Sequence, residues 1–369
     1  MTLSVMPRGF LSLGPCLELQ EMLREFRFGS SQERRHMLKT GFVGAGTTGN
    51  ALAVRLSQKG WPVVGVSSRT LSSAQKLASR VPGCQAYRTA QELADVAEMV
   101  LITTPDDVIA QVCSQVHWHK GQSVLHCSGA HSVDILEPAK KVGAAVGSFH
   151  PLQTFADIDQ AIANLPGSTF AVEAEEPLLS TLQELTQLLS GNWVKLGSGD
   201  KVLYHVAAVF ACNYLVTLVK LALDLWKGFG VSSKEATTAL LPLVRGTVNN
   251  IGRIGLPACL TGPIARGDLG TIERHLRALA GRSPSLLTAY KELGLQTIPM
   301  ALAKGKVNEQ KAQEMRLLFG RPDLAHCHSE EVSMKSRRRK NLPRGNCSNG
   351  SEIVEILRCA QNDGKRGIE

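Results

Sequence analysis

Three glycines lie at the spacing of a dinucleotide-binding turn. In the stretch KTGFVGAGTTGNALA they are Gly44, Gly46 and Gly49, and Thr47 and Thr48 lie between the last two. Such glycines permit a tight turn, let the backbone approach a pyrophosphate and let the helix pack closely on the strand. Backbone amides at the start of the following helix then face the anion. Because an apolar run precedes the glycines and a helical pattern follows them, we predict that a dinucleotide phosphate binds here.

The loop after the second predicted strand indicates which dinucleotide binds. This loop reads Ser67-Ser68-Arg69-Thr70. A site that prefers NAD usually places Asp or Glu here to bind the ribose 2′-hydroxyl. The loop has no carboxylate, but its hydroxyls and guanidinium suit a 2′-phosphate. We therefore predict NADP as the cofactor, with a solvated loop charge as the alternative for Arg69.

Polar residues also follow the fourth predicted strand. Thr104 and Pro105 come directly after it, and Asp106 and Asp107 come next. Ligands bind at the carboxyl ends of the strands in an open parallel sheet. We therefore expect Thr104 and Pro105 along the ribose and nicotinamide side of the cofactor. The two aspartates would equally suit the cap of the following helix.

Two further strand ends carry candidate catalytic residues. Ser128 follows the fifth predicted strand and would bond the nicotinamide amide or the substrate, unless it is an N-cap beside a Gly129 turn. His150 lies in GSFHP at the end of the next strand. It would bind a substrate carboxylate or donate a proton. The alternative for His150 is a turn histidine fixed by Pro151.

A long helical segment supplies the other acid–base candidates. Lys201 and His205 are four residues apart and so share a helix face, and Asn213 lies two further turns along. A desolvated lysine titrates nearer neutral pH, and a histidine does so readily. The alternative is a solvated Lys201 and a core His205. In the later loop LTGPIARGD, Arg266 would clamp a substrate carboxylate or phosphate, or a partner subunit.

The periodicity of the chain changes once. Short apolar strands alternate with helical segments up to residue 196, which predicts a mostly parallel, doubly wound sheet with helices on both faces. From residue 199 to 318 only helical periodicity remains. The predicted fold is an α/β Rossmann domain followed by an all-α C-terminal domain. The predicted strands are residues 41–44, 63–67, 84–87, 99–103, 123–127, 144–149, 168–172 and 193–196.

These patterns give the domain boundaries. We assign residues 37–197 to the dinucleotide-binding domain and 198–320 to a helical substrate and dimerisation domain. Residues 1–36 are expected to be a non-native or disordered extension, with Met37 as the natural start. Residues 321–369 are polar and basic and are expected to form a disordered tail.

Composition narrows the functional classes. The 369-residue chain has a formal charge of +9 but only 5% aromatic residues, and its basic cluster at residues 335–340 lies in the tail, so nucleic acid is not expected as a partner. Nine cysteines without a C-x-x-C pair favour a reducing cytoplasm. The stretch Ala325-His326-Cys327-His328 with Cys347 matches no zinc spacing, so no metal is expected.

One segment raises the question of a membrane. Residues 202–225 form the longest apolar run, and their number is sufficient to span a bilayer. Polar side chains interrupt the run, including Asn213, Lys220 and Asp224. We therefore predict a buried core helix and no membrane partner.

Six stretches together resemble the DUF2520 family, whose members carry an N-terminal Rossmann-like domain. This family belongs to a wider group with 6-phosphogluconate dehydrogenase, β-hydroxyacid dehydrogenases, pyrroline-5-carboxylate reductase, prephenate dehydrogenase and F420-dependent NADP reductase. The resemblance covers about residues 38–319. The stretches are GFVGAGTTGNALA, ITTPDDVI, HCSGAHSVDIL, GSFHPLQTF, GDKVLYHVAAVFACNYLV and LTGPIARGD.

The resemblance implies an NADP-dependent oxidoreductase. It would transfer hydride between the nicotinamide and a small anionic carbonyl, alcohol or imine substrate. In the hydroxyacid dehydrogenases a lysine at the start of the corresponding helix handles the substrate proton, and Lys201 resembles that lysine. The match departs from the pattern because Gly197 and Gly199 lie closer to the lysine and no Asn-Asn pair follows. Relatives dimerise through the helical domain, so a homodimer is expected.

Two other functions remain open at this stage. A dinucleotide-binding sensor or assembly protein without turnover would keep the glycine turn but would not need Lys201, His205 or His150. An enzyme that uses the deazaflavin F420 as hydride partner would also carry the glycine motif.

Overall fold

The computed structural model describes residues 37–321. The predictions for residues 1–36, for the tail from residue 322, for its basic cluster and for the stretch around His326 lie outside this range. The chain divides into two compact units, one ending at Thr217 and the other starting at Leu218. The start of the long helical segment, which we assign to the helical domain from residue 198, falls within the first unit.

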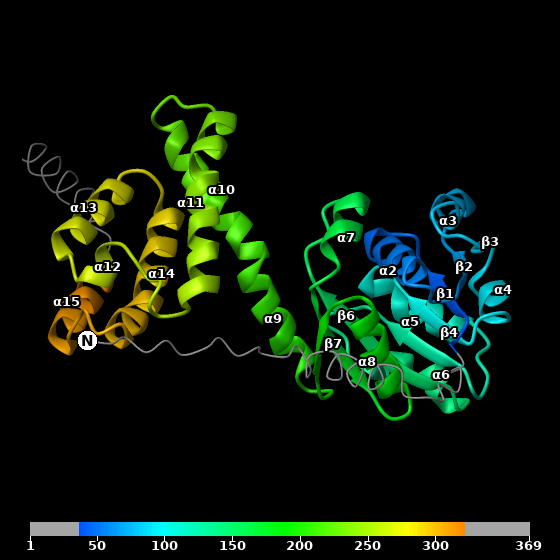
Figure 1. The fold of residues 1–369 in the computed structure, drawn as a ribbon. Coiled ribbons are helices and arrows are strands. Elements are labelled where there is room, and N and C mark those ends of the chain that lie inside the picture. The colour runs from blue at the N-terminus through cyan, green and yellow to red at the C-terminus, as the bar shows by residue number, and fades with distance from the viewer. Residues whose placement is uncertain (1–36, 322–369) are drawn as a thin grey trace, which may run out of the picture. The chain divides into compact units, whose positions relative to one another are not determined.

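The first unit is built on one eight-stranded sheet (Figure 1). The strand order is β3-β2-β1-β4-β5-β6-β7-β8, and all neighbours are parallel except β6 and β7. All eight predicted strands are present, which confirms the predicted α/β class. Their bounds are β1 Thr40–Val43, β2 Val63–Ser67, β3 Gln85–Tyr87, β4 Met99–Ile102, β5 Ser123–His126, β6 Ala145–Leu152, β7 Thr169–Ala174 and β8 Asn192–Lys195.

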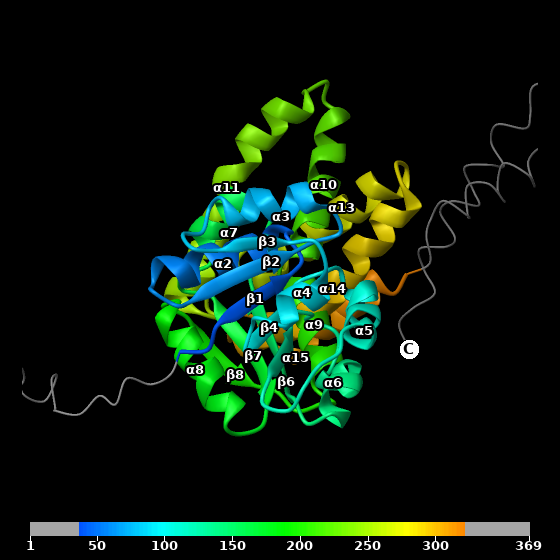
Figure 2. The ribbon, with the colours of Figure 1, turned by 90° about the vertical axis from the view of Figure 1, so that its right-hand side faces the viewer.

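Helices cover both faces of this sheet (Figure 2). On one face, buried residues of α2, α3, α7 and α8 form a core with Phe42, Phe149 and Phe170 of the strands. On the other face, α4, α5 and α6 pack over Val100, Ile102 and related strand residues. The bounds are α2 Thr47–Gln58, α3 Leu71–Ala78, α4 Ala90–Ala94, α5 Asp106–Gln115, α6 Glu137–Lys141, α7 Ile158–Asn164 and α8 Leu178–Leu188, with a short 3-10 helix η1 at Val133–Leu136.

The strand β6 is longer than its parallel neighbour β5. Its last pair with β5 joins Ser148 to His126, but β6 continues to Leu152. The antiparallel strand β7 pairs along this extension, and β8 pairs with β7. As a result, the end of β8 at Lys195 lies near the level of the end of β5 at His126. The chain leaves the sheet there and forms the helix that starts at Lys201.

The second unit is helical, as predicted. It contains α11 Ser233–Ile254, α12 Pro263–Arg266, α13 Leu269–Ala280, α14 Pro284–Ala303 and α15 Glu309–Phe319. Ile272, Ile298, Met315 and Phe319 form its core. Asp268 caps α13, because the Thr271 amide donates to its Oδ1 at 3.0 Å.

The long apolar segment differs from its prediction. It forms α9 Lys201–Ala211 and α10 Asn213–Lys227, with a distorted backbone at Cys212. The prediction of a buried core helix was wrong, because α10 has no buried residue and α9 has only Lys201. Composition identified the apolar side chains, but nothing among the described residues covers them. By length and composition alone, Lys201–Lys227 would also suffice to span a membrane.

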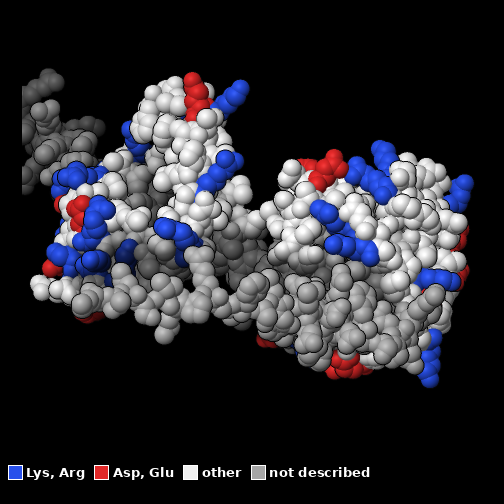
Figure 3. Space-filling model, viewed as in Figure 1, with Lys and Arg blue, Asp and Glu red and all other residues white. Residues whose placement is uncertain are grey.

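Charged side chains are dispersed over the described surface seen in Figure 3. Lys and Arg lie there in separate groups among mostly uncharged residues and a few acidic ones, and form no continuous basic face in this view. Several of them pair within their own helix, as Lys220 and Lys227 do with Asp224.

Candidate active site

Each of the three glycines in the turn after β1 has a different surrounding, which shows why a side chain is absent there. Gly44 has φ of +119°, which L side chains rarely adopt, and a Cβ there would lie 2.7 Å from the Thr103 backbone. A Cβ on Gly49 would collide with the carbonyl oxygen of Gly44. A Cβ on Gly46 would meet no atom within 4 Å. The outer two glycines are therefore required by the protein itself, whereas Gly46 leaves space open.

The start of α2 offers unsatisfied amides beside that open space. Gly46 is the N-cap and provides no side-chain hydrogen bond, and Thr47 and Thr48 form the half-buried first turn. The first amides of a helix lack intrahelical partners and carry the positive end of its dipole. This end of α2 can therefore hold an anion.

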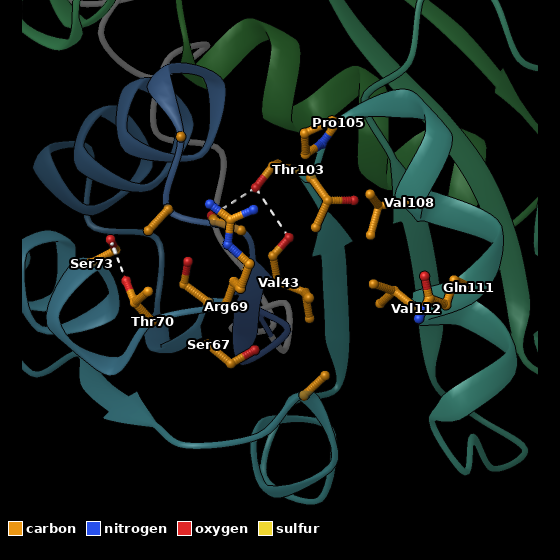
Figure 4. Close-up of a pocket in the computed structure, with 16 residues that line it drawn as sticks. Val43, Ser67, Arg69, Thr70, Ser73, Thr103, Pro105, Val108, Gln111 and Val112 are labelled. Carbon is orange, nitrogen blue, oxygen red and sulfur yellow. Dashed lines mark hydrogen bonds between the residues drawn. The ribbon is translucent and has the colours of Figure 1, made fainter.

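A cavity of about 610 Å³ lies against the turn (Figure 4). Its lining brings together the glycine turn, the loop after β2 and the residues after β4, so the predicted Ser67, Ser68, Arg69, Thr70, Thr104 and Pro105 all line it. The strand order reverses between β2 and β4 on either side of β1, the place where open α/β sheets bind ligands. Thr47 and Thr48 are not among the lining residues.

The loop after β2 presents a free positive charge to the cavity. Figure 4 shows Arg69 among the lining side chains. Within residues 37–321 Arg69 makes no hydrogen bond or ion pair, and no carboxylate lines the cavity. The hydroxyl of Ser67 is buried and has no hydrogen-bond partner in the described chain. A buried hydroxyl without a partner is costly, so a ligand that supplies one is favoured.

The residues after β4 both support the turn and line the cavity. Thr103 Oγ1 donates to the Gly44 carbonyl at 2.9 Å and so fixes the turn against β4. The Thr104 hydroxyl is buried without a partner among the described residues. Asp106 and Asp107 form the first turn of α5, whose N-cap is Pro105, so the capping alternative for them was wrong.

The hydroxyl of Ser128 hydrogen-bonds to neighbouring protein groups. It donates to Asp106 Oδ2 at 2.7 Å and accepts from the amides of Ala130 and His131, each at 3.1 Å. Ser128 is buried, with 2% of its surface exposed. The hydroxyl thus fixes the loop after β5, and it is the Ser128 carbonyl that points toward the long helix.

Lys201 is buried at the centre of the candidate site. Only 1% of its surface is exposed. Its ammonium donates to the Ser128 carbonyl at 2.8 Å and to the Ser148 hydroxyl at 2.6 Å. Burial lowers the pKa of Lys201, while Glu173, Cys127 and Asp106 oppose that shift. The start of α9 is therefore bonded to both β6 and the loop after β5.

Two histidines converge on Gly129. His150 Nδ1 lies 2.8 Å from the Tyr204 hydroxyl, which directs His150 Nε2 toward Gly129. A Cβ on Gly129 would lie 2.9 Å from His150 Nε2 and 2.8 Å from His205 Nδ1. His205 Nδ1 has no partner in the described residues. Gly129 is therefore needed for both rings to approach.

Two histidines near Lys201, His150 and His126, are kept neutral. Burial, together with Lys201 and His205, lowers the pKa of His150 to about 4. Burial and Lys201 likewise lower the pKa of His126 to about 3. At neutral pH, His150 can therefore donate one ring N–H but carries no charge.

All five predicted catalytic residues lie in the first unit, and four of them are brought close together: Ser128, His150, Lys201 and His205. Asn213 begins α10, beyond the break at Cys212. Arg266 belongs to the second unit, is 66% exposed at its side chain and lies 3.9 Å from Asp268. No His, Cys, Asp or Glu cluster suited to a metal occurs among residues 37–321.

Sequence reasoning missed several residues of the site. Tyr204 lies beside His205 in the helical motif, so its helix position could have indicated it. Ser148 and Gly129 were part of quoted motifs but gave no signal of their own. Their importance comes from contacts across more than 50 residues, such as Lys201 with Ser148.

Two family descriptions match separate parts of the chain. Residues 27–151 match the Rossmann-like domain, and residues 168–297 match the domain of unknown function DUF2520. The two matches follow one another along the chain, and the second is to the family that the six sequence stretches resemble. No curated protein matches it.

Solved structures share this architecture. A protein from Thermotoga maritima is 26% identical, with a TM-score of 0.59, and the match covers 72% of this chain and 99% of that one. A proposed NADP oxidoreductase from Bacteroides fragilis is 24% identical, with a TM-score of 0.56, covering 71% and 98%. A reductive aminase from Aspergillus terreus, solved with NADPH4, cyclohexanone and allyl amine, is 16% identical, with a TM-score of 0.54, covering 75% and 99%.

Proposed function

We propose that this chain, which joins a Rossmann-like domain to a DUF2520 domain, is an NADP-dependent oxidoreductase. It would transfer hydride between the nicotinamide and a small anionic carbonyl, alcohol or imine compound. The observation that carries the proposal is the cavity at the glycine turn, which no carboxylate lines. Among residues 37–321, its Arg69 is unpaired and its buried Ser67 hydroxyl has no hydrogen-bond partner. The similar structures described as an NADP oxidoreductase and as an NADPH4 complex support the choice of cofactor.

The residues that line the cavity suit the parts of such a cofactor. The open Gly46 and the first amides of α2 would hold the pyrophosphate. Arg69 and the serines after β2 would hold the 2′-phosphate, and Thr104 and Pro105 would lie along the nicotinamide side. When bound, NADPH supplies a hydride to the substrate carbon. The group around Lys201 would bind and orient the substrate beside it.

The chain itself supplies a reason for a homodimer. α9 presents Leu203 and Phe210 with 74% and 65% of their surfaces exposed, and Val216 on α10 is 68% exposed. Exposed apolar area of this extent is typical of an interface. Lys220, Asp224 and Lys227 form ion pairs on the same segment, which suits a protein partner better than a lipid core. We propose that a second copy covers this face and that the protein is cytoplasmic.

Calorimetry of the full-length protein tests the cofactor assignment. We expect NADPH to bind at least ten-fold more tightly than NADH. The variant Arg69→Ala should lose most of that preference, because a charged hydrogen bond to phosphate contributes about 1.5–3 kcal/mol. Arg80→Ala is the matched control, because Arg80 pairs with Asp159 outside the cavity. Failure of every nicotinamide to bind would contradict the proposal and would favour a deazaflavin or a non-catalytic role.

A further inference from the structure

Asp106 lies between the dinucleotide cavity and the loop after β5. It directly follows Thr104 and Pro105, which line the cavity (Figure 4), and it is the first residue of α5. Its carboxylate accepts a hydrogen bond from the Ser128 hydroxyl, with 2.7 Å between Oδ2 and Oγ. Asp106 therefore contacts the loop after β5, while the two residues before it contact the space for a ligand.

The hydrogen bonds continue from that loop to the start of α9. The carbonyl of Ser128 accepts from the Lys201 ammonium at 2.8 Å. Its hydroxyl also accepts from the amides of Ala130 and His131, each at 3.1 Å. Both Ser128 and Lys201 are buried, with 2% and 1% of their surfaces exposed. Ser128 thus joins Asp106 to Lys201 through its hydroxyl on one side and its carbonyl on the other.

The helix α9 has little buried surface of its own. Of residues 201–211, Lys201 alone is buried. Tyr204 adds one hydrogen bond, with 2.8 Å between its hydroxyl and His150 Nδ1. An element with few buried contacts opens locally at a low cost in free energy. The local stability of α9 therefore depends on individual bonds, of which the bond from Lys201 to Ser128 is one.

The cavity side of this path carries groups that a ligand can satisfy. The Thr104 hydroxyl is buried and has no partner within residues 37–321. Pro105 is the N-cap of α5 and gives this helix no side-chain cap. A ligand that bonds to Thr104 and packs on Pro105 restricts both residues, and so restricts the carboxylate that follows them. Binding of this kind stabilises the bonds that depend on that carboxylate.

We propose that Asp106 is a positioning residue, which transmits occupancy of the dinucleotide cavity through Ser128 to Lys201 and so fixes the start of α9. This inference rests on the proposed function, because the dinucleotide is the ligand that restricts Thr104 and Pro105. The linkage is reciprocal, so a fixed α9 also favours the bound dinucleotide. The helix is then held most firmly when the cofactor is present.

Hydrogen exchange followed by mass spectrometry tests this linkage in the full-length protein, with and without saturating NADPH. NADPH should slow the exchange of amides 204–211 at least about five-fold, the lower end of typical coupling between two sites. The amides of Ala130 and His131, which bond to Ser128, should slow as well. The amides of α8 are the internal reference, because that helix takes no part in the path.

The outcomes separate this inference from the proposed function. Unchanged exchange in residues 204–211, or equal slowing in α8, overturns the inference, whereas NADPH binding in calorimetry leaves the cofactor assignment intact. Failure of NADPH to bind overturns both.

Two neighbouring aspartates give a matched pair of variants. Asp106→Ala removes the acceptor of the Ser128 hydroxyl. Asp107→Ala removes the same charge from the same turn of α5, and exposed Asp107 makes no hydrogen bond or ion pair within residues 37–321. NADPH should slow exchange in residues 204–211 of Asp107→Ala but not of Asp106→Ala. Asp106→Asn keeps an acceptor oxygen and should restore the slowing.

The dependence on NADPH distinguishes positioning from a merely structural role. A structural role would lower stability in Asp106→Ala without removing the NADPH-dependent slowing, so equal slowing in both alanine variants contradicts the proposal. Near-ultraviolet circular dichroism shows whether each variant is folded. If Asp106→Ala is not folded, the comparison of α9 with α8 in the unmodified protein still decides the question.

Discussion

The ammonium of Lys201 donates to the carbonyl oxygen of Ser128, 2.8 Å away and 73 residues earlier in the chain. This bond joins the start of α9 to the loop after β5, a loop already fixed by Asp106 through the Ser128 hydroxyl. A helix outside the sheet is thereby anchored to the carboxyl edge of the strands. The candidate chemistry depends on that anchor, because His205 and Tyr204 lie on the same helix.

Removing the second acceptor of Lys201 should destabilise the protein. Ser148→Ala leaves the buried ammonium with one hydrogen bond fewer, so we expect the free energy of unfolding to fall by about 1–3 kcal/mol. Urea denaturation followed by fluorescence measures the change. Ser114→Ala is the control, because that exposed hydroxyl bonds only to Gln111 of its own helix. Equal stability of the two variants would show that Ser148 does not support the charge.

Alanine substitutions at Gly49 and Gly46 should affect different properties, the first protein stability and the second NADPH affinity. Gly49→Ala places a methyl group against the Gly44 carbonyl, and overpacking of this kind costs about 1–3 kcal/mol. Gly46→Ala meets no protein atom, so stability should change by less than about 0.5 kcal/mol. NADPH affinity should nevertheless fall for Gly46→Ala, because the methyl group enters the space left for the pyrophosphate. Thermal melts and calorimetry distinguish the two effects, and unchanged NADPH affinity would exclude Gly46 from the phosphate site.

Acid should destabilise the fold through His126. Burial and the charge of Lys201 hold its folded-state pKa at about 3, compared with an ordinary 6.5. The folded state therefore binds fewer protons than the unfolded state as the pH falls from 6.5 to 3, and stability is lost across that window. This group alone gives a slope of up to about 1.4 kcal/mol per pH unit. The free energy of unfolding measured against pH reports the slope.

A variant isolates the contribution of this histidine. His126→Gln should flatten the acid limb of the stability profile, because the glutamine does not titrate. Exposed His117 provides the control through His117→Gln, which should leave the slope unchanged. If the acid limb of both variants equals that of the unmodified protein, the loss of stability at low pH belongs to other groups, among them His150.

The apolar face of α9 should hold two copies together. Leu203→Glu combined with Phe210→Glu places two carboxylates on the exposed face, so we expect dimers to become monomers in light scattering. Lys76→Glu on the exposed side of α3 is the control and should leave the mass unchanged. A monomeric unmodified protein at micromolar concentration would contradict the dimer, and retention on phospholipid vesicles would point instead to a membrane surface.

The sequence predicted the sheet well because local patterns determine it. Every apolar run between residues 40 and 196 that was expected to be a strand is one, and the glycine spacing located the turn after β1. The helix spacing of Lys201 and His205 also placed both near the other candidates. These features depend on neighbours only a few residues away.

Other features depend on contacts that local patterns do not encode. The pairing of His150 with Tyr204 crosses 54 residues, and the burial of Lys201 requires Ser128 and Ser148 together. The exposure of α9 and α10 was missed for a related reason. Hydrophobic periodicity reports that a helix has an apolar side, but not whether the same chain covers it.

The extension of β6 beyond β5 acts as a spacer for the whole site. Because β7 and β8 are built on that extension, its length determines how far along the sheet the chain travels before α9 begins. Shortening β6 by one pair of residues would preserve the facing of its side chains but withdraw the start of α9 by the rise of two strand residues, about 7 Å. Lys201 would then lie out of reach of the Ser128 carbonyl, although every residue of the site would still be present. In this protein the length of β6, as much as any side chain, determines the position of the Lys201 ammonium.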